Sequence, residues 1–409
     1  MTLSFDKDRV RIVLLENIAP TARKVFEAAG YKNVEEVPGA LEGDELLKKI
    51  ADARIVGIRS TSKLTKDFFA QAQKVMAVGC FCIGTNQVDL NAALIKGIPV
   101  FNAPFSNTRS VAELTISSLI QLMRRIPEKN AALHRGAWDK SAKNSNEVRG
   151  KTLGIVGYGN IGIQLAVLAE QLGMRVHFYD IEKKLAVGNA HPTNSLEELL
   201  KISDVVSLHV PETADTKMML DANRISLIKP GACLINYSRG TVVDMEALAE
   251  ALKSKKLRGA AIDVFPKEPK SKDEEFLSPL RGLDCALLSP HVGGSTEEAQ
   301  EAIGIEVAEK LVKYFDNGSS TSAVNFPQVS LPQHPKAYRI LNIHENKPGV
   351  LQQLNAVFAD AQANVVGQFL QTTEKVGYVV TDIEAKGDPE TFRTSLKAIP
   401  GSIRTRILQ

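Results

Sequence analysis

Short apolar runs alternate with amphipathic stretches along most of the chain. In the first hundred residues, strands are expected at 11–15, 34–37, 55–58, 74–79 and 99–101. The stretches between them, such as 20–30 and 43–50, favour helices. Six further strands are expected at 153–156, 175–179, 205–209, 233–236, 259–262 and 286–289. Strands that alternate with helices form parallel sheets covered on both faces, so the pattern predicts two doubly wound α/β domains.

Two long helices connect these series. Ser110 and Glu113 have the spacing of a capping box, which predicts that a helix begins with Ser110 as its N-cap and runs to about residue 125. A second helix is expected at 296–315. Residues 325–335 are rich in proline and are interpreted as a linker. The last 74 residues alternate as strand, helix, strand, strand, helix, strand, which is the ferredoxin-like plan.

We therefore expect three domains. The first α/β domain begins with the first hundred residues, and the second holds six expected strands, the number of a complete dinucleotide-binding sheet. A small third domain spans 336–409, after the linker.

Composition narrows the class of protein. Charged residues make up 24% of the chain and the net charge is +3, so neither disorder nor a dedicated nucleic-acid surface is expected. No apolar run has the length of a membrane span, and the amino terminus carries no secretory signal pattern. The four cysteines have neither disulfide nor metal-ligand spacing, so we expect buried thiols, no metal and a cytoplasmic location.

A glycine-rich turn follows the first strand of the second series. The segment 157–162 reads Gly-Tyr-Gly-Asn-Ile-Gly and opens a helical stretch. Its glycines permit a tight turn, a close approach to a pyrophosphate and close helix–strand packing. Asp180 ends the next strand, where its carboxylate can accept bonds from the ribose hydroxyls and repel a 2′-phosphate. The segment predicts an NAD site formed by Gly157, Gly159, Asn160, Ile161, Gly162 and Asp180.

Three later segments bring an arginine, a glutamate and a histidine to the carboxyl ends of strands, where open α/β sheets bind ligands. These segments are 236–240, 263–269 and 289–294. A guanidinium can hold a carboxylate through two hydrogen bonds, and an imidazole can take a hydroxyl proton as a hydride leaves. A carboxylate can orient that imidazole and stabilise its cation. Arg239, Glu268 and His291 are therefore candidates for the dehydrogenation of a 2-hydroxy acid.

Together with 157–162, these segments resemble the D-isomer-specific 2-hydroxyacid dehydrogenase family. The resemblance implies that Arg239 orients the substrate, that His291 is the general acid/base and that Glu268 is its partner. It also implies that Asp263 lies near the nicotinamide. Further cofactor contacts are implied for Tyr237, Ser238, Arg239, His291, Gly293 and Gly294. The resemblance also implies a discontinuous, flavodoxin-like substrate-binding domain that combines residues 1–106 with 297–330, and a Rossmann domain for NAD at 107–296.

The segments 78–89 and 101–114 resemble a bacterial branch of that family. The activity implied is the NAD-dependent oxidation of 3-phospho-D-glycerate to 3-phosphohydroxypyruvate, the first step of L-serine biosynthesis, with reduction of 2-oxoglutarate as a side activity. The substrate contacts implied by the resemblance are Arg59, Ser60, Asn107 and Arg239.

The phosphate subsite departs from the pattern of the branch. Some relatives carry a second arginine two positions after the first, where this chain has Thr61. Lys63, or the basic residues Arg135 and Lys140 beside Trp138, could hold the phosphate in its place. These three cations could equally be solvated surface charges.

The segment 342–351 runs from a strand into a helix, with Pro348 in the first helical turn. It resembles an ACT domain, a module that binds small amino acids at dimer interfaces. The resemblance implies that residues 336–409 form a regulatory domain and that His344, Asn346 and Asn364 bind serine as an effector. It also implies a homotetramer built from two kinds of contact, one through the C-terminal domains and one through residues 110–125 and the segment around Trp138. A dimerisation module without a ligand is the alternative.

Three other functions stay open. A dehydrogenase of an unphosphorylated 2-hydroxy acid would leave Arg59 and the C-terminal domain without a purpose. A non-enzymatic NAD-sensing protein could retain Arg239, Glu268 and His291. An amino-acid-binding regulatory protein would need a vestigial dinucleotide-binding core.

Overall fold

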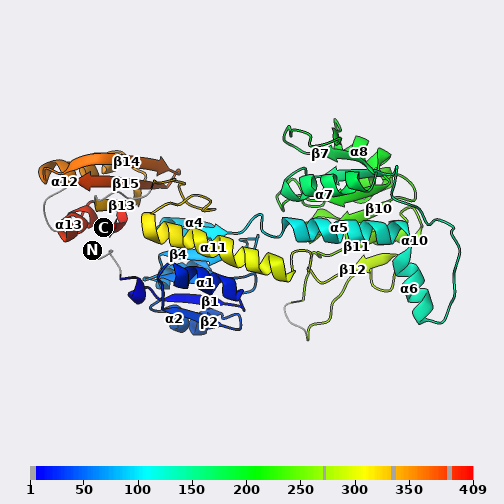
Figure 1. Cartoon of the computed structure of the whole chain (residues 1–409), viewed down its shortest axis with the longest axis horizontal. Helices are drawn as coiled ribbons and strands as arrows, with labels where there is room; N and C mark the ends of the chain where they lie inside the picture. The colour runs from blue at the N-terminus through cyan, green and yellow to red at the C-terminus, as the bar shows by residue number, and fades with distance from the viewer. Residues whose placement is uncertain (1–5, 270–272, 333–337, 385–388, 409) are drawn as a thin grey trace. The chain divides into compact units, whose positions relative to one another are not determined.

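The computed structural model describes residues 6–269, 273–332, 338–384 and 389–408. The chain divides into two compact units, of which the first joins residues 1–106 to 300–409 and the second spans 107–299. The first unit holds two sheets and the second holds one. Each unit is described in turn, and the labels follow Figure 1.

The amino-terminal sheet is parallel and five-stranded, in the order β2-β1-β3-β4-β5. This is the flavodoxin-like order that the sequence predicted. Its strands are β1 (Ile12–Leu15), β2 (Val34–Val37), β3 (Ile55–Ile58), β4 (Ala77–Cys80) and β5 (Val100–Asn102). The accompanying helices are α1 (Pro20–Ala28), α2 (Gly43–Ile50), α3 (Lys66–Gln71), α4 (Leu90–Ile95) and α11 (Glu297–Asn317), and a 3-10 turn, η1, spans Lys7–Arg9. All residues of β1, β3 and β4 are buried, as expected for parallel strands covered on both faces.

The carboxy-terminal sheet is antiparallel and four-stranded, in the order β14-β15-β13-β16. It confirms the predicted ferredoxin-like plan, with strands β13 (Tyr338–Glu345), β14 (Asn364–Thr372), β15 (Val376–Glu384) and β16 (Ser402–Leu408). Helices α12 (Val350–Asp360) and α13 (Pro389–Lys397) cover one face, where Leu354 and Leu396 pack against Ile383. Residues 336, 337 and 409 of the predicted domain lie outside the described residues.

The other face of this sheet is buried against the first sheet's helices. Leu341 and Tyr378 belong to one apolar cluster with Tyr314 and Phe326. The Tyr378 hydroxyl donates to the Gly318 carbonyl at 2.7 Å, and the buried Arg406 donates to the Phe315 carbonyl at 2.9 Å. The small sheet therefore shares a core with the rest of the first unit, so that removing it would expose apolar surface there.

The predicted linker is packed rather than exposed. Phe326 and Val329 are buried, and the Asn325 side chain accepts from the Val100 amide and donates to the Ile98 carbonyl. Residues 333–335 of the predicted linker lie outside the described residues. The proline-rich composition indicated the break between domains, but the alternating apolar positions between the prolines bind residues 325–332 to the first sheet.

The second unit is built on a parallel sheet in the order β12-β11-β10-β9-β6-β7-β8. All six predicted strands are present, as β6 (Thr152–Val156), β7 (Arg175–Tyr179), β9 (Val205–Leu208), β10 (Cys233–Asn236), β11 (Gly259–Ile262) and β12 (Ala286–Leu288). A seventh, β8 (His191–Pro192), was missed because two residues carry no periodicity. The helices are α5 (Thr108–Met123), α6 (Ile126–His134), α7 (Asn160–Gln171), α8 (Leu196–Ile202), α9 (Ala222–Leu227) and α10 (Met245–Lys253), with a 3-10 turn, η2, at Gly240–Val242. The strand order changes direction between β6 and β9, and open sheets bind ligands at such a point.

The predicted capping box at Ser110 is wrong. Helix α5 begins at Thr108, with Asn107 as the N-cap residue and no side-chain capping bond. The Ser110 hydroxyl instead bonds to the Thr296 hydroxyl at 2.9 Å, and Glu113 pairs with Arg109 one turn earlier. These long-range and helical partners outweigh the local capping pattern.

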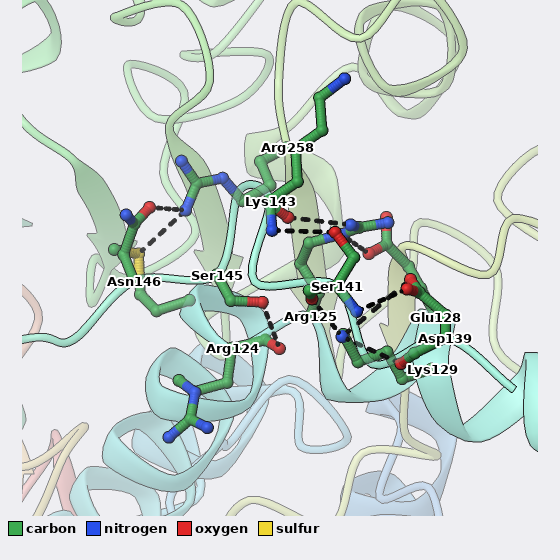
Figure 2. A network of polar contacts seen from close by, with 11 residues as sticks. Arg124, Arg125, Glu128, Lys129, Asp139, Ser141, Lys143, Ser145, Asn146 and Arg258 are labelled. Carbon is green, nitrogen blue, oxygen red and sulfur yellow. Dashed lines mark hydrogen bonds and ion pairs between the residues drawn. The ribbon is translucent and has the colours of Figure 1, made fainter.

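The irregular segment after α6 is held in place by polar contacts, which Figure 2 shows. The Lys129 ammonium donates to the carbonyls of Asp139 and Ser141, and the Arg125 guanidinium donates to the Lys143 carbonyl. Arg258, just before β11, donates to the Asn146 side chain at 2.6 Å (Figure 2). These contacts hold the segment around Trp138, a residue that is 78% exposed.

Membrane-spanning helices, disulfides and metal-binding groups are all absent from the described residues. No described helix is both long and apolar enough to span a membrane. All four cysteines are free thiols, and Cys80 and Cys233 are buried. Within the described ranges, His, Cys, Asp and Glu side chains do not gather into a group that could hold a metal.

Candidate active site and dinucleotide site

Three loops at the carboxyl ends of β10, β11 and β12 carry the predicted catalytic residues. Asn236, the last residue of β10, organises the first loop. Its amide donates to the Arg239 carbonyl at 2.9 Å, while its side-chain oxygen accepts from the backbone and hydroxyl of Ser238. A Cβ on Gly240 would come within 2.0 Å of the Phe265 backbone, so only glycine lets this loop lie against the next one. The half-buried Arg239 is thus held beside the Glu268 loop.

His291 and Glu268 form the pair that the sequence predicted. Nδ1 of His291 lies 2.9 Å and 3.1 Å from the two carboxylate oxygens of Glu268, which also accepts from the Phe265 amide. The hydrogen bond to Glu268 raises the pKa of His291 above its ordinary value of 6.5, although burial opposes it. Burial tends to raise the pKa of Glu268, but the bond from His291 and the nearby charges hold this pKa below 4.5. The pair therefore favours an imidazolium beside a carboxylate.

Arg239 acts on the same pair electrostatically. Its positive charge lowers the pKa of both Glu268 and His291, which places the three groups within range of one another. Its guanidinium donates to the Ser238 carbonyl at 2.7 Å. The Nε2 atom of His291 has no hydrogen-bond partner among the described residues, so it is available to a ligand.

Asp263 holds the turn that carries His291. The side chain is 1% exposed, and its two oxygens accept from the Ser289 hydroxyl at 2.6 Å and from the amides of Val292 and Gly293 at 2.9 and 2.8 Å. The Asp263 carbonyl accepts from the His291 amide at 2.8 Å. His291 has φ +55°, a left-handed conformation that costs energy for a non-glycine residue. Asp263 therefore compensates for strain in the turn that carries His291.

The glycine turn between β6 and α7 has the geometry of a phosphate-binding loop. Gly157 has φ +91°, and a Cβ there would lie 2.5 Å from the His209 carbonyl. Gly159 has no heavy atom within 4 Å of the place where its Cβ would lie, so the turn is open on that side. Helix α7 starts at Asn160 without a side-chain cap, which leaves the amides of Asn160 and Ile161 for a phosphate. These features fit a bound dinucleotide.

Asp180 stands at the end of β7, next to this turn. Its oxygens accept from the amides of Tyr158 and Glu182 at 2.8 and 2.9 Å, which orients the carboxylate. The Tyr158 ring stacks on Phe178 at 3.7 Å, and its hydroxyl accepts from the Val187 amide. The aspartate thus belongs to a rigid support that the sequence did not indicate, since the contacts of Tyr158 are tertiary.

The other predicted cofactor residues occupy the same sheet edge. Tyr237 and Ser238 use their side chains inside the protein, because the Tyr237 hydroxyl bonds to Ser118 at 2.6 Å and the Ser238 hydroxyl to Asn236. Each of these hydroxyls therefore already has a partner within the protein. Gly293 packs on Asp263, and Gly294 lies against the Asn107 amide, whose buried side-chain oxygen has no hydrogen-bond partner.

The predicted anion-binding residues of the first unit lie at the carboxyl end of β3. Arg59 is half-buried and Ser60 is exposed. Among the residues that the structure describes, the Arg59 guanidinium has no ion-pair or hydrogen-bond partner. Lys63 is exposed nearby, whereas Arg135 in the second unit pairs with Asp284. The charge of Arg59 is therefore available to an anionic group, as are those of the exposed Lys63 and Lys140.

The predicted effector residues are divided between the two ends of the small sheet. His344 is buried, and its register partner on β15 is Gly377, whereas Asn364 pairs with Glu384 at the far end of the same strand. Asn346 donates to the Thr373 carbonyl near His344. One chain cannot bring Asn364 to the other two residues. A site that uses all three needs two copies, and the edge strand β14 exposes Val365 and Val366.

Two protein-family models match parts of the chain. Residues 116–293 match the model of the D-isomer specific 2-hydroxyacid dehydrogenase, NAD binding domain. Residues 340–404 match the model of the AHAS small subunit-like ACT domain.

Curated relatives match over the whole length. The chain is 58% identical over 406 residues to the D-3-phosphoglycerate dehydrogenase of Haemophilus influenzae, covering 99% of each chain. It is 58% identical over 407 residues to that of Escherichia coli K12, again with 99% of each covered, and 45% identical to that of Dictyostelium discoideum, over 100% of this chain and 99% of that one.

Solved structures of other proteins are similar to most of the chain. The TT0316 protein of Thermus thermophilus is 32% identical with a TM-score of 0.66, over 74% of this chain and 96% of that chain. The D-lactate dehydrogenase of Aquifex aeolicus, complexed with NAD and lactic acid, is 26% identical with a TM-score of 0.66, over 75% and 96%.

Proposed function

Because the chain belongs to the D-3-phosphoglycerate dehydrogenases of the D-isomer specific 2-hydroxyacid dehydrogenase family, it is an NAD-dependent oxidoreductase, and we propose that Arg239, Glu268 and His291 carry its reaction. That reaction is the oxidation of 3-phospho-D-glycerate to 3-phosphohydroxypyruvate, the first step of L-serine biosynthesis. The observation that supports the assignment most is the His291–Glu268 pair beside Arg239, with Nε2 of His291 left for a substrate.

In the oxidation, Arg239 binds the substrate carboxylate through its guanidinium and fixes the hydroxyl-bearing carbon. His291 takes the hydroxyl proton at Nε2 while Glu268 holds the Nδ1 proton and stabilises the imidazolium that forms. In the reverse direction the imidazolium returns its proton to the carbonyl oxygen. NAD, held by the glycine turn and Asp180, supplies the hydride acceptor.

The charge on His291 gives the two directions opposite pH dependences. Oxidation needs the neutral imidazole, whereas reduction needs the imidazolium. Because the bond to Glu268 raises the pKa of His291, the imidazolium persists to higher pH than in an isolated histidine. Reduction of the oxo acid is therefore the convenient direction for assay near neutral pH.

The proposal also covers the roles of the domains, the substrate contacts and the location of the protein. Residues 1–106 with 297–330 bind the substrate, 107–296 bind NAD and 336–409 regulate. Arg59, Ser60 and Asn107 contact the substrate, with Arg59 on its phosphate. A cytoplasmic location belongs to the proposal as well.

Serine is the proposed effector. His344 and Asn346 of one chain and Asn364 of a second chain would hold it, because one chain separates them along β15. Pairing of C-terminal domains, added to contacts around α5 and Trp138, gives a homotetramer with two kinds of interface. Serine would then favour a state in which the catalytic groups and the nicotinamide do not align.

One assay tests the function. NADH consumption is followed with 3-phosphohydroxypyruvate, glyoxylate, pyruvate and 2-oxoglutarate, with and without serine. We expect the highest kcat/KM with 3-phosphohydroxypyruvate and a loss of rate with serine. Faster turnover of an unphosphorylated acid would contradict the substrate, no turnover at all would favour an NAD-sensing protein, and indifference to serine would contradict the effector.

A further inference from the structure

A buried carboxylate lies under the loop that carries Arg59. Glu16 follows β1 directly and is 9% exposed. Its Oε2 accepts from the Thr61 amide at 3.0 Å and its Oε1 from the Ser62 amide at 2.8 Å. Both oxygens are thus committed to the backbone of one loop. No salt bridge neutralises Glu16 among the described residues, so these amides are its main compensation.

The topology explains how two distant segments meet here. Strands β1 and β3 are parallel neighbours, with Leu14 opposite Gly57. Glu16 and Arg59 therefore both emerge at the carboxyl edge of the sheet, each two residues after that pair. Glu16 has φ +66°, a left-handed conformation that is unfavourable for a residue with a side chain. A strained backbone that places a buried carboxylate against a loop indicates a constraint that the loop requires.

The same loop is held from its other side. The Gln87 amide donates to the Arg59 carbonyl at 2.5 Å, and the Cys82 thiol lies 3.6 Å from that carbonyl. The Ser62 hydroxyl accepts from the Leu41 amide at 3.3 Å. Glu16 and Gln87 together fix the backbone on both sides of Ser60, and neither bonds to the Arg59 guanidinium. The charge of that guanidinium is therefore left for a ligand.

From this arrangement we infer that Glu16 is a positioning residue for the substrate, which acts by holding the Arg59 loop in the geometry that receives the substrate's anionic group. The inference rests on the proposed role of Arg59. Glu16 touches no substrate and takes no part in proton or hydride transfer. It therefore contributes to substrate affinity and leaves the chemical step and the binding of NADH unchanged.

Glu16→Gln tests this with the smallest change in shape. An amide turns one acceptor into a donor, so that either the Thr61 or the Ser62 amide faces another donor and the loop must shift. We expect the KM for 3-phosphohydroxypyruvate to rise by about 10-fold, a change of ~1.4 kcal/mol at the low end for a hydrogen bond to a charged group. The kcat and the KM for NADH should stay within about two-fold.

The deciding comparison is the double variant. If Glu16 acts through Arg59, adding Glu16→Gln to Arg59→Ala raises the KM no further than Arg59→Ala alone. Multiplication of the two single effects would overturn the inference and leave Glu16 as a general stabiliser of the fold. An unchanged KM in folded Glu16→Gln would overturn it as well.

Two further variants protect the test. Glu35→Gln, on the neighbouring β2, removes a half-buried carboxylate from pairs with Arg11 and Lys49 and should leave every kinetic constant unchanged. If thermal unfolding shows that Glu16→Gln is not folded, Glu16→Asp is measured instead. This variant keeps the negative charge but shortens the side chain by one methylene. A folded Glu16→Asp with unchanged KM would overturn the inference, and a raised KM that disappears in the Arg59→Ala background supports it.

The test also separates this inference from the proposed function. If the wild-type enzyme does not reduce 3-phosphohydroxypyruvate, the proposed substrate is wrong. The same KM comparison is then made with the acid that the wild type reduces best. A KM effect of Glu16→Gln that depends on Arg59 supports the inference with that acid too, and its absence overturns it.

Discussion

Asp263→Asn would test whether the catalytic turn depends on a buried carboxylate. The substitution keeps the shape but replaces one oxygen by an amide nitrogen. On one oxygen the Ser289 hydroxyl and the Val292 amide converge, and on the other the Gly293 amide. The new amide would face the single donor, Gly293, and leave that N–H without an acceptor. A buried unsatisfied group of this kind costs about 1–3 kcal/mol.

Asp263→Asn should also slow the chemical step. Without its anchor the left-handed turn at His291 can relax, and a misplacement of ~1 Å at a reacting group costs about 100-fold in rate. Loss of the Asp263 charge also lowers the pKa of His291, in the same direction as loss of Glu268. We expect kcat to fall by about 10- to 100-fold. Thermal unfolding should occur several degrees lower, at roughly 2–4 °C per kcal/mol.

Asp244→Ala is the matched control. Asp244 caps α10 in the same unit by accepting from the amides of Glu246 and Ala247, so its loss costs about 1 kcal/mol without touching the His291 turn. NADH consumption and thermal unfolding are measured for both variants. If Asp263→Asn kept the wild-type kcat, or lost no more activity than Asp244→Ala at equal stability, the anchoring of His291 by Asp263 would be refuted.

Three further variants test the cofactor, the proton and the effector. Glu268→Gln removes the group that raises the pKa of His291, so this pKa should fall. The kcat/KM for oxidation should then persist to lower pH than in the wild type, and the kcat/KM for reduction should begin to decline at lower pH. Unchanged pH profiles would contradict the pairing. Asp180→Ser should raise the KM for NADH and relax the discrimination against NADPH, and a wild type that uses both equally would contradict the role of Asp180. A coupling of about 1–3 kcal/mol would let serine change affinity or activity by roughly 5- to 150-fold. Asn346→Ala should abolish this serine effect and keep a normal kcat, whereas retained inhibition would place the serine site elsewhere.

Deleting residues 336–409 is a poorer test of the effector. It would uncover Tyr314 and Phe326, which the small sheet buries. A truncated enzyme could then lose activity through instability alone, so the substitution in the effector site is preferred.

The parts of the fold that could be predicted have local signals. The strand, glycine turn and helix at 152–171 are adjacent in the sequence, and Gly157 and Gly162 have steric reasons that the spacing reveals. The alternation of strands and helices gave all three sheets for the same reason.

The parts that could not be predicted depend on partners far along the chain. Asp263 receives hydrogen bonds from residues 26 to 30 positions away, and Glu16 from residues 45 and 46 positions away. The capping pattern at Ser110 failed because Thr296, 186 positions away, takes its hydroxyl. Sequence reasoning thus named the candidate catalytic groups, including the Glu268 partner of His291, but not the loop contacts of Asp263 and Glu16.

The most direct test of the mechanism is the kcat of His291→Asn for the reduction of 3-phosphohydroxypyruvate, measured beside the Kd for NADH. If His291 is the general acid/base, kcat falls by about 100-fold or more while the Kd for NADH stays within about two-fold. A variant that binds NADH normally and retains a near-normal kcat would contradict the account, because the proton would then move through another group.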